Sequence, residues 1–153
     1  MWYLPFWIFF AVSLIAAGIS LVIRKPRFID IQIFLMAAAL VMSCDMIFCK
    51  QYHLYHYGLE GYAGWYSFWA NLFIIPALGI VFIKFVPEGL KGVLIYIAVW
   101  TIAFTWFEIF VTAPLGILHY TGWKVFPYST IGYIIAFSLE YGYYKMLLKH
   151  CSK

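Results

Sequence analysis

Five runs of about twenty mostly apolar residues divide this chain of 153 residues, and they constrain its fold more than any other feature. A helix needs roughly 20 apolar residues to cross the hydrocarbon core of a bilayer. Because only short polar segments separate the runs, the sequence predicts an all-α bundle, a single transmembrane domain over residues 1–153 that crosses the membrane five times. The predicted spans cover residues 3–23, 28–48, 65–86, 92–115 and 128–148.

The composition excludes the main soluble classes of protein. Charged residues make up 10% of the chain and hydrophobic residues 66%, whereas about a quarter of a soluble domain is charged. So apolar a chain is neither a soluble domain nor a disordered segment. The net charge of +4 is spread over the loops, which excludes a nucleic-acid partner and leaves membrane lipids as the expected one.

The basic residues predict the orientation of the bundle. Arg24, Lys25 and Arg27 follow the first apolar run instead of preceding it, which argues against a signal peptide. If five spans alternate, eight of the ten Lys and Arg residues fall on one side, and Lys50 and Lys124 fall on the other. Since basic residues favour the cytoplasmic side, the N-terminus is expected outside and the C-terminus inside a plasma membrane.

Four polar residues lie at membrane depth within the predicted spans. With a rise of 1.5 Å per residue, Asp45, Asn71 and Glu108 lie roughly 10, 7 and 6 Å from the span centres toward the outer face. Glu140 lies near the midplane. Such residues usually face the bundle interior and mark functional sites, so the sequence predicts an outward-facing cavity lined by carboxylates.

Spacing adds further residues to this cavity. In the fourth span a polar stripe follows helical steps of four, three and four, which places its members on one face; it consists of Thr101, Thr105, Glu108 and Thr112. The fifth span has a similar stripe. The predicted ligand-binding residues are Asp45, Asn71, Thr101, Thr105, Glu108, Thr112, Tyr133 and Glu140. The alternative is that the hydroxyl and amide groups only bind helices to one another.

The buried carboxyls have no predicted basic partner. Lys84 and Lys145 lie near the cytoplasmic ends of their spans, and we expect their side chains to extend outward to the headgroups. Because desolvation disfavours a charged carboxylate, Asp45, Glu108 and Glu140 are expected to be neutral or to pair with a cation from elsewhere. That cation could be a proton, a metal ion or an amine-bearing ligand.

Histidines on the two outer loops form a second candidate site. His53, His56 and His119, with Asp45 or Glu60, offer ligands that suit zinc or a similar ion, and two of the histidines could hold haem iron. The alternative is that these side chains lie among tyrosines at headgroup level and bind no metal. The sequence therefore leaves the cofactor unknown.

Three segments resemble a known family: residues 71–87, Trp100 with Glu108, and residues 117–123. In this order they are similar to small multi-pass membrane proteins of spore-forming Gram-positive bacteria, a family without an assigned activity. The resemblance implies a compact bundle in a bacterial plasma membrane, and it implies no catalytic residue.

Two functions fit these features. In the first, a non-enzymatic plasma-membrane protein binds a small molecule, a lipid or a cation, as an accessory subunit or a small transporter. In the second, a membrane-embedded enzyme acts on a lipid or isoprenoid, with Glu108 and Glu140 as acid and base. No catalytic motif occurs, and an acid–base pair needs two different environments, whereas these carboxyls are expected to have similar apolar surroundings. The first function, ligand binding without catalysis, is therefore favoured. So thin a bundle is also compatible with a homo-oligomer or with a partner membrane protein.

Overall fold

The computed structural model describes residues 3–58 and 63–151, and these residues form five long helical segments and one short β-ribbon. Several segments contain a π-helical stretch (η) that continues or precedes an α-helix. The segments are α1 (Leu4–Ile23); α2 (Phe28–Asp45) with η1 (Met46–Gln51); α3 (Ala63–Trp69) with η2 (Ala70–Ile74) and α4 (Ile75–Lys84); α5 (Leu90–Phe107) with η3 (Glu108–Thr112); and η4 (Val125–Ser129) with α6 (Thr130–Cys151). The ribbon pairs β1 (Tyr55–Tyr57) with β2 (Leu118–Tyr120) in antiparallel register.

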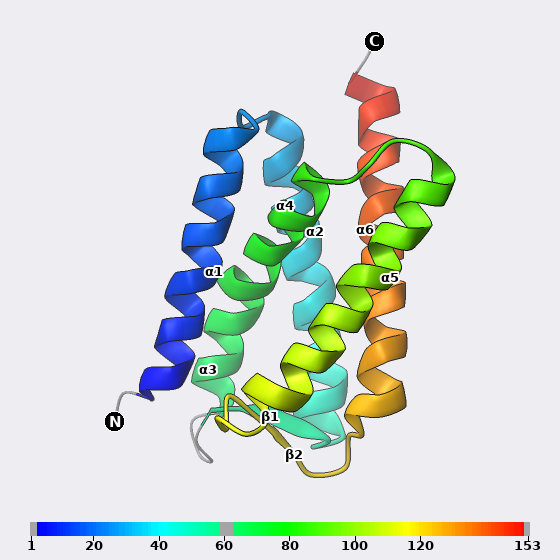
Figure 1. Cartoon of the computed structure of the whole chain (residues 1–153). Helices are drawn as coiled ribbons and strands as arrows, with labels where there is room; N and C mark the ends of the chain where they lie inside the picture. The colour runs from blue at the N-terminus through cyan, green and yellow to red at the C-terminus, as the bar shows by residue number, and fades with distance from the viewer. Residues whose placement is uncertain (1–2, 59–62, 152–153) are drawn as a thin grey trace.

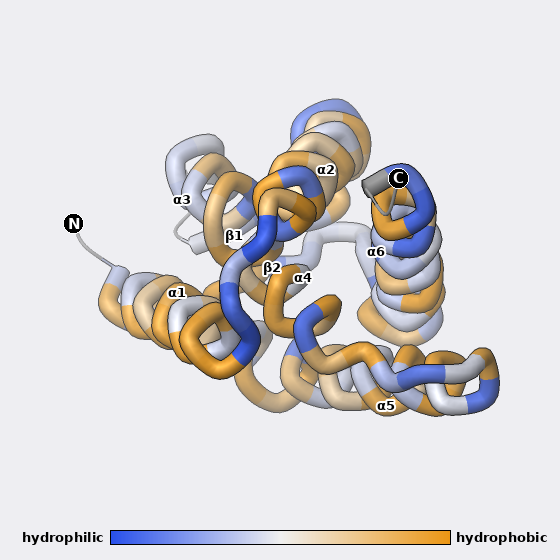
Figure 2. Tube along the Cα trace, turned by 90° about the horizontal axis from the view of Figure 1, so that it is seen from above, coloured by the Kyte–Doolittle hydropathy of each residue, from blue (hydrophilic) through white to orange (hydrophobic). Residues whose placement is uncertain are grey.

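The helical segments alternate between two ends of the bundle (Figure 1). One end, the ribbon end, carries the N-terminus, β1 and β2. The opposite end, the turn end, carries the α1–α2 turn, the α4–α5 turn and the C-terminus of α6. Seen from the turn end, α4 lies among α1, α2, α5 and α6, and hydrophilic stretches lie in the turns and near the end of α6 (Figure 2).

Four of the segments in the described part of the chain are long and apolar enough to cross a membrane: Leu4–Ile23, Phe28–Gln51, Gly64–Lys84 and Leu90–Thr112. Large apolar side chains cover the outside of the bundle, as at Val22, which is 84% exposed. Asp30, Asn71 and Glu108, in contrast, are buried. This inverted distribution is that of a helical membrane protein, because lipid accepts apolar side chains and offers polar ones no hydrogen-bond partner.

Two clusters of apolar side chains hold the bundle together, one near each end. At the turn end Phe82 of α4 is fully buried, and its ring lies 4.6 Å from that of Phe137 and 5.1 Å from that of Tyr96. At the ribbon end Phe6 packs on Tyr66 with ring centroids 4.8 Å apart. Because α4 contributes to the first cluster and η2 to the second, the third helical segment forms the centre of the bundle.

The helical prediction is confirmed for all five segments, whose ends differ by a few residues from those expected. The ribbon was not predicted, because its strands are only three residues long and far apart in sequence. Membrane crossing by α6 stays a prediction, since this helix is not among the four apolar ones.

The expectation that Lys84 extends outward to the headgroups is wrong. Its side chain is 1% exposed, and Nζ lies 2.6 Å from Oδ2 of Asp30 and donates to the Lys25 carbonyl at 2.9 Å. The backbone N–H of Arg27 also donates to Asp30. The ion pair with Asp30 holds the Lys84 side chain inside the bundle instead of at the headgroups. The pair also joins the end of α4 to the start of α2.

Candidate functional site

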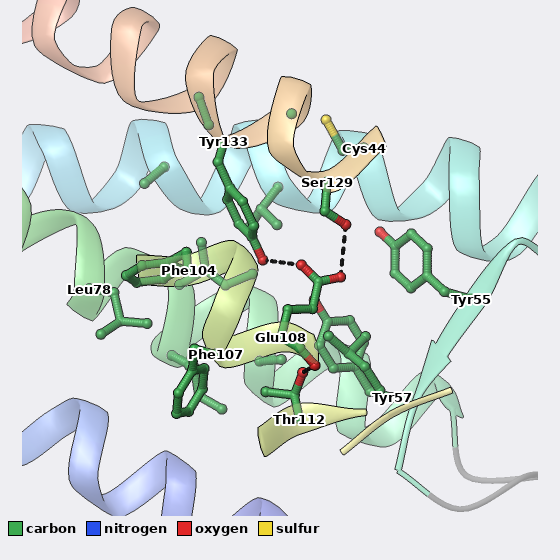
Figure 3. Close-up of a pocket in the computed structure, with 18 of the residues that line it drawn as sticks. Cys44, Tyr55, Tyr57, Leu78, Phe104, Phe107, Glu108, Thr112, Ser129 and Tyr133 are labelled. Atoms are coloured by element: carbon green, nitrogen blue, oxygen red, sulfur yellow. Dashed lines mark hydrogen bonds between the residues drawn. The ribbon is translucent and has the colours of Figure 1, made fainter. Parts of the chain in front are cut away.

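A cavity of about 300 Å³ lies inside the bundle. Its lining comes from α1, α2, α4, α5, α6 and both strands of the ribbon and is mostly aliphatic or aromatic. Polar side chains gather at the ribbon end of the cavity around Glu108 (Figure 3). Glu140, farther along α6, also lines the cavity. Ligand pockets typically begin at about this size and combine apolar walls with a few polar groups.

Glu108 is buried, and three hydroxyl groups donate to its carboxylate. Tyr120 and Ser129 donate to Oε1, the latter at 2.8 Å, and Tyr133 donates to Oε2 at 2.6 Å. Figure 3 shows the carboxylate between Ser129 and Tyr133, with Tyr55 directed into the same space. The three hydroxyl donors therefore satisfy both carboxyl oxygens of Glu108 inside the bundle, where lipid offers no hydrogen-bond partner.

A second layer of contacts fixes the hydroxyl shell. Trp123 donates from Nε1 to the Ser129 hydroxyl at 2.8 Å, so Ser129 accepts from Trp123 while it donates to Glu108. The Thr112 hydroxyl donates to the backbone carbonyl of Glu108 at 3.1 Å. Because the Ser129 oxygen accepts the Trp123 N–H, its own hydroxyl proton is directed at the Glu108 carboxylate.

Phenol groups of the ribbon are neutral donors at this end of the cavity. Burial raises the pKa of Tyr55, Tyr57 and Tyr120 above the ordinary range for tyrosine. The neighbouring carboxyls raise the pKa further, Asp45 for Tyr55 and Glu108 for Tyr120. All three therefore keep their protons at neutral pH.

Irregular helix geometry occurs beside the polar residues. The π-helical stretch η3 begins at Glu108, η2 contains Asn71, and η1 follows Asp45 directly. In η3 the amide of Ala113 donates to the Glu108 carbonyl, five residues back, at 3.0 Å. Such π-turns are rare in α-helices and are frequent at functional sites.

Glu140 has very different surroundings from Glu108. It is 6% exposed, and its Oε1 has no hydrogen-bond partner among the described residues. The carboxyl lies against Gly79 of α4 so closely that a methyl group there would approach Oε1 to 2.2 Å. The expectation that the two carboxyls share similar apolar surroundings is therefore wrong, because the hydroxyl shell reaches Glu108 alone.

The remaining predicted residues are buried but do not line the cavity. Asp45 and Asn71 lie on helices that pack together, and within the described ranges neither Oδ1 atom has a partner. Thr105 contacts Thr130 of α6, with hydroxyl oxygens 3.2 Å apart, and the Thr101 hydroxyl has no partner in the described part of the chain. The stripe from Thr101 to Thr112 is thus buried throughout, but only its ribbon-end half, with Tyr133 and Glu140 of α6, reaches the cavity.

The three histidines do not come together. His56 and His119 are cross-strand partners whose rings stack 4.9 Å apart, whereas His53 occupies an exposed loop position with φ of 52°. Among the residues that the structure describes, no three His, Cys, Asp or Glu side chains are arranged to hold a metal ion. Glu60, the further predicted ligand, lies outside the described residues.

Sequence reasoning missed the groups that the ribbon and the loop before α6 bring to the site. Tyr55, Tyr57, Tyr120 and Trp123 lie outside the predicted spans, yet all four line the cavity. Ser129 belongs to the polar stripe of the fifth span and is not among the predicted ligand-binding residues. Helical periodicity could identify Ser129, but it holds no signal for side chains that reach the site from a loop.

Comparison with protein-family models, with curated protein sequences and with solved structures gives no match for this chain. The chemistry of the site is therefore the basis for assigning a function.

Proposed function

We propose that this protein is an integral plasma-membrane protein that binds an elongated, mainly apolar small molecule, of the lipid or isoprenoid class, in the central cavity. The polar group of the ligand contacts Glu108 and its hydroxyl shell, and the apolar body extends along α6 toward Glu140. The observation that carries the proposal is an apolar cavity with one polar end, formed by Glu108, Ser129 and Tyr133.

The dimensions of the cavity support an elongated ligand. Glu140 follows Tyr133 by seven residues, which is roughly 10 Å along a helix. A small, compact ligand bound at Glu108 would therefore not reach Glu140, whereas an elongated ligand can contact both residues. Three hydroxyl donors already compensate the charge of Glu108, so we favour a ligand with a hydroxyl or amine group over a bare metal ion.

We further propose that α6 is the fifth span, with the ribbon end outside and the turn end in the cytoplasm of a bacterial cell. The alternation of the helices and the basic residues of the turn end support this orientation. The cavity then has its polar end near the outer face, as an accessory subunit or a small transporter would need.

Mass spectrometry of small molecules that co-purify with the protein in mild detergent tests the proposal. We expect one apolar species near a 1:1 ratio with the parent, and much less of it with Glu108→Gln, because the amide of Gln cannot accept all three hydroxyl bonds. Equal retention by the parent and Glu108→Gln would contradict a role for the carboxylate in binding.

The second candidate function is a membrane-embedded enzyme that acts on a lipid or isoprenoid. The different surroundings of Glu108 and Glu140 favour it. Three hydroxyl groups donate to Glu108, whereas Oε1 of Glu140 has no hydrogen-bond partner among the described residues. Such different environments are what an acid–base pair requires. A Glu140→Gln variant separates the two functions. A binding protein retains the same molecule in the parent and the variant, whereas an enzyme would accumulate unconverted substrate, of different mass or structure, in the variant.

A further inference from the structure

A second cavity, of about 680 Å³, lies at the turn end, far from Glu108. It is bounded by the α1–α2 turn, the α4–α5 turn and the last turns of α6, and its lining is rich in basic residues. The charged side chains that line it are Arg24, Lys25, Arg27, Lys84, Lys145 and Glu88.

Among the described residues, Lys84 forms an ion pair with Asp30, whereas the other four cations form no ion pair within 4.0 Å. Lys84 is therefore neutralised, and Glu88 is the one acidic residue that lines the cavity. The cavity thus carries a clear excess of positive charge and attracts an anion.

Contacts with aromatic rings orient two of the guanidinium groups. Arg24 lies over Phe85 with Cζ 5.8 Å from the ring centroid, and Arg27 lies over Tyr144 at the same distance. Arg27 also donates to the Tyr144 hydroxyl at 3.4 Å. A guanidinium has five N–H donors in a planar fork that suits phosphate oxygens. Among the described residues the Arg27 guanidinium makes one hydrogen bond, to Tyr144, which leaves other donors for a ligand.

The buried ion pair holds this basic turn in place. Lys84 donates to the backbone carbonyl of Lys25 at 2.9 Å while it pairs with Asp30. The backbone of the α1–α2 turn is thereby fixed to the end of α4. A site whose backbone is already ordered loses less entropy when it binds.

We propose that the turn-end cavity binds the phosphate headgroup of an anionic phospholipid. Basic pockets between membrane-spanning helices on the cytoplasmic side bind such headgroups. A lipid fits better than free phosphate because apolar side chains flank the basic turn: Ile23 is 62% exposed and Phe28 68% exposed. They offer the acyl chains a surface directly beside the headgroup. This site is independent of the ligand proposed for the central cavity.

Lipid titration of the full-length protein in detergent micelles tests the proposal, with phosphatidylglycerol and phosphatidylcholine of identical acyl chains as probes. We expect tighter binding of phosphatidylglycerol, weakening as salt rises. The double variant Arg24→Gln/Lys145→Gln should weaken phosphatidylglycerol binding by about fivefold for each removed charge. The matched control Lys50→Gln/Lys124→Gln removes two charges from the ribbon end and should bind like the parent.

Equal affinity for the two lipids, or an equal loss in the Lys50→Gln/Lys124→Gln control, would overturn the proposal. Inorganic phosphate and glycerol 1-phosphate serve as soluble competitors, and displacement of the lipid by either at comparable concentration would assign the site to a soluble phosphate instead. If the Arg24→Gln/Lys145→Gln variant does not fold by circular dichroism, Lys145→Gln alone repeats the test, since Lys145 is an exposed residue.

Discussion

Glu108 and Glu140 are both buried glutamates that line one cavity, yet their neighbours make them chemically unlike. Glu108 accepts hydrogen bonds from Tyr120, Ser129 and Tyr133. Glu140 lies against Gly79, and its Oε1 has no partner in the described residues. The same substitution should therefore have different consequences at the two positions.

Glu108→Gln should lower the free energy of unfolding by about 1–3 kcal/mol, because it replaces charge-assisted hydrogen bonds and turns an amide donor toward a hydroxyl donor. Glu140→Gln is the matched control and should change stability by less than about 0.5 kcal/mol, since no hydrogen bond of its Oε1 is lost. Unfolding in mixed micelles of increasing SDS fraction measures the change in unfolding free energy for both variants. A loss for Glu140→Gln as large as that for Glu108→Gln would contradict the assignment of their surroundings.

The helices are the part of the structure that the sequence predicts best. A bilayer requires apolar runs of defined length, so the runs locate the segments, and the Thr101 to Thr112 spacing correctly identifies a buried face. Periodicity does not say which neighbouring helix a face meets. The contact of Asp30 with Lys84 spans 54 residues, and that of Glu108 with Tyr120 depends on the ribbon. Contacts of this kind follow from packing and leave no local signal.

The Asp30–Lys84 pair fastens α2 to α4, and its energetics can be tested directly. Lys84→Met should lower the free energy of unfolding by about 3–5 kcal/mol, because it leaves the buried Asp30 carboxylate without its ion-pair partner. The double variant Asp30→Asn/Lys84→Met should recover most of this loss, and Lys91→Met, at an exposed position of α5, should change little. A double variant no more stable than Lys84→Met would show that the ion pair is not the source of the effect.

Single cysteines test the orientation and the crossing by α6. In a background without native cysteines, Lys124→Cys should react with an impermeant maleimide added to intact cells. Glu88→Cys and His150→Cys should react only after the membrane is made permeable. If His150→Cys were labelled from outside like Lys124→Cys, α6 would not cross the membrane and the five-span proposal would fail.

At the scale of the whole molecule, the two ends of the bundle have different chemistry. The ribbon end holds a carboxylate among hydroxyl groups at one end of an apolar cavity. The turn end holds basic residues around an open, polar cavity. A membrane protein with these two ends can hold an apolar ligand inside the bundle while anionic lipid fixes its depth and orientation in the bilayer.

The most direct test of ligand binding fills the central cavity without touching Glu108. Ala136 of α6 lines this cavity, whereas Ala39 of α2 is exposed on the outside of the bundle. Mass spectrometry should find the co-purifying apolar molecule at near 1:1 occupancy in the parent and in Ala39→Phe, and near background in Ala136→Phe, because the added ring occupies the ligand's space. Retention of the molecule by Ala136→Phe at the level of the parent would contradict binding in the cavity.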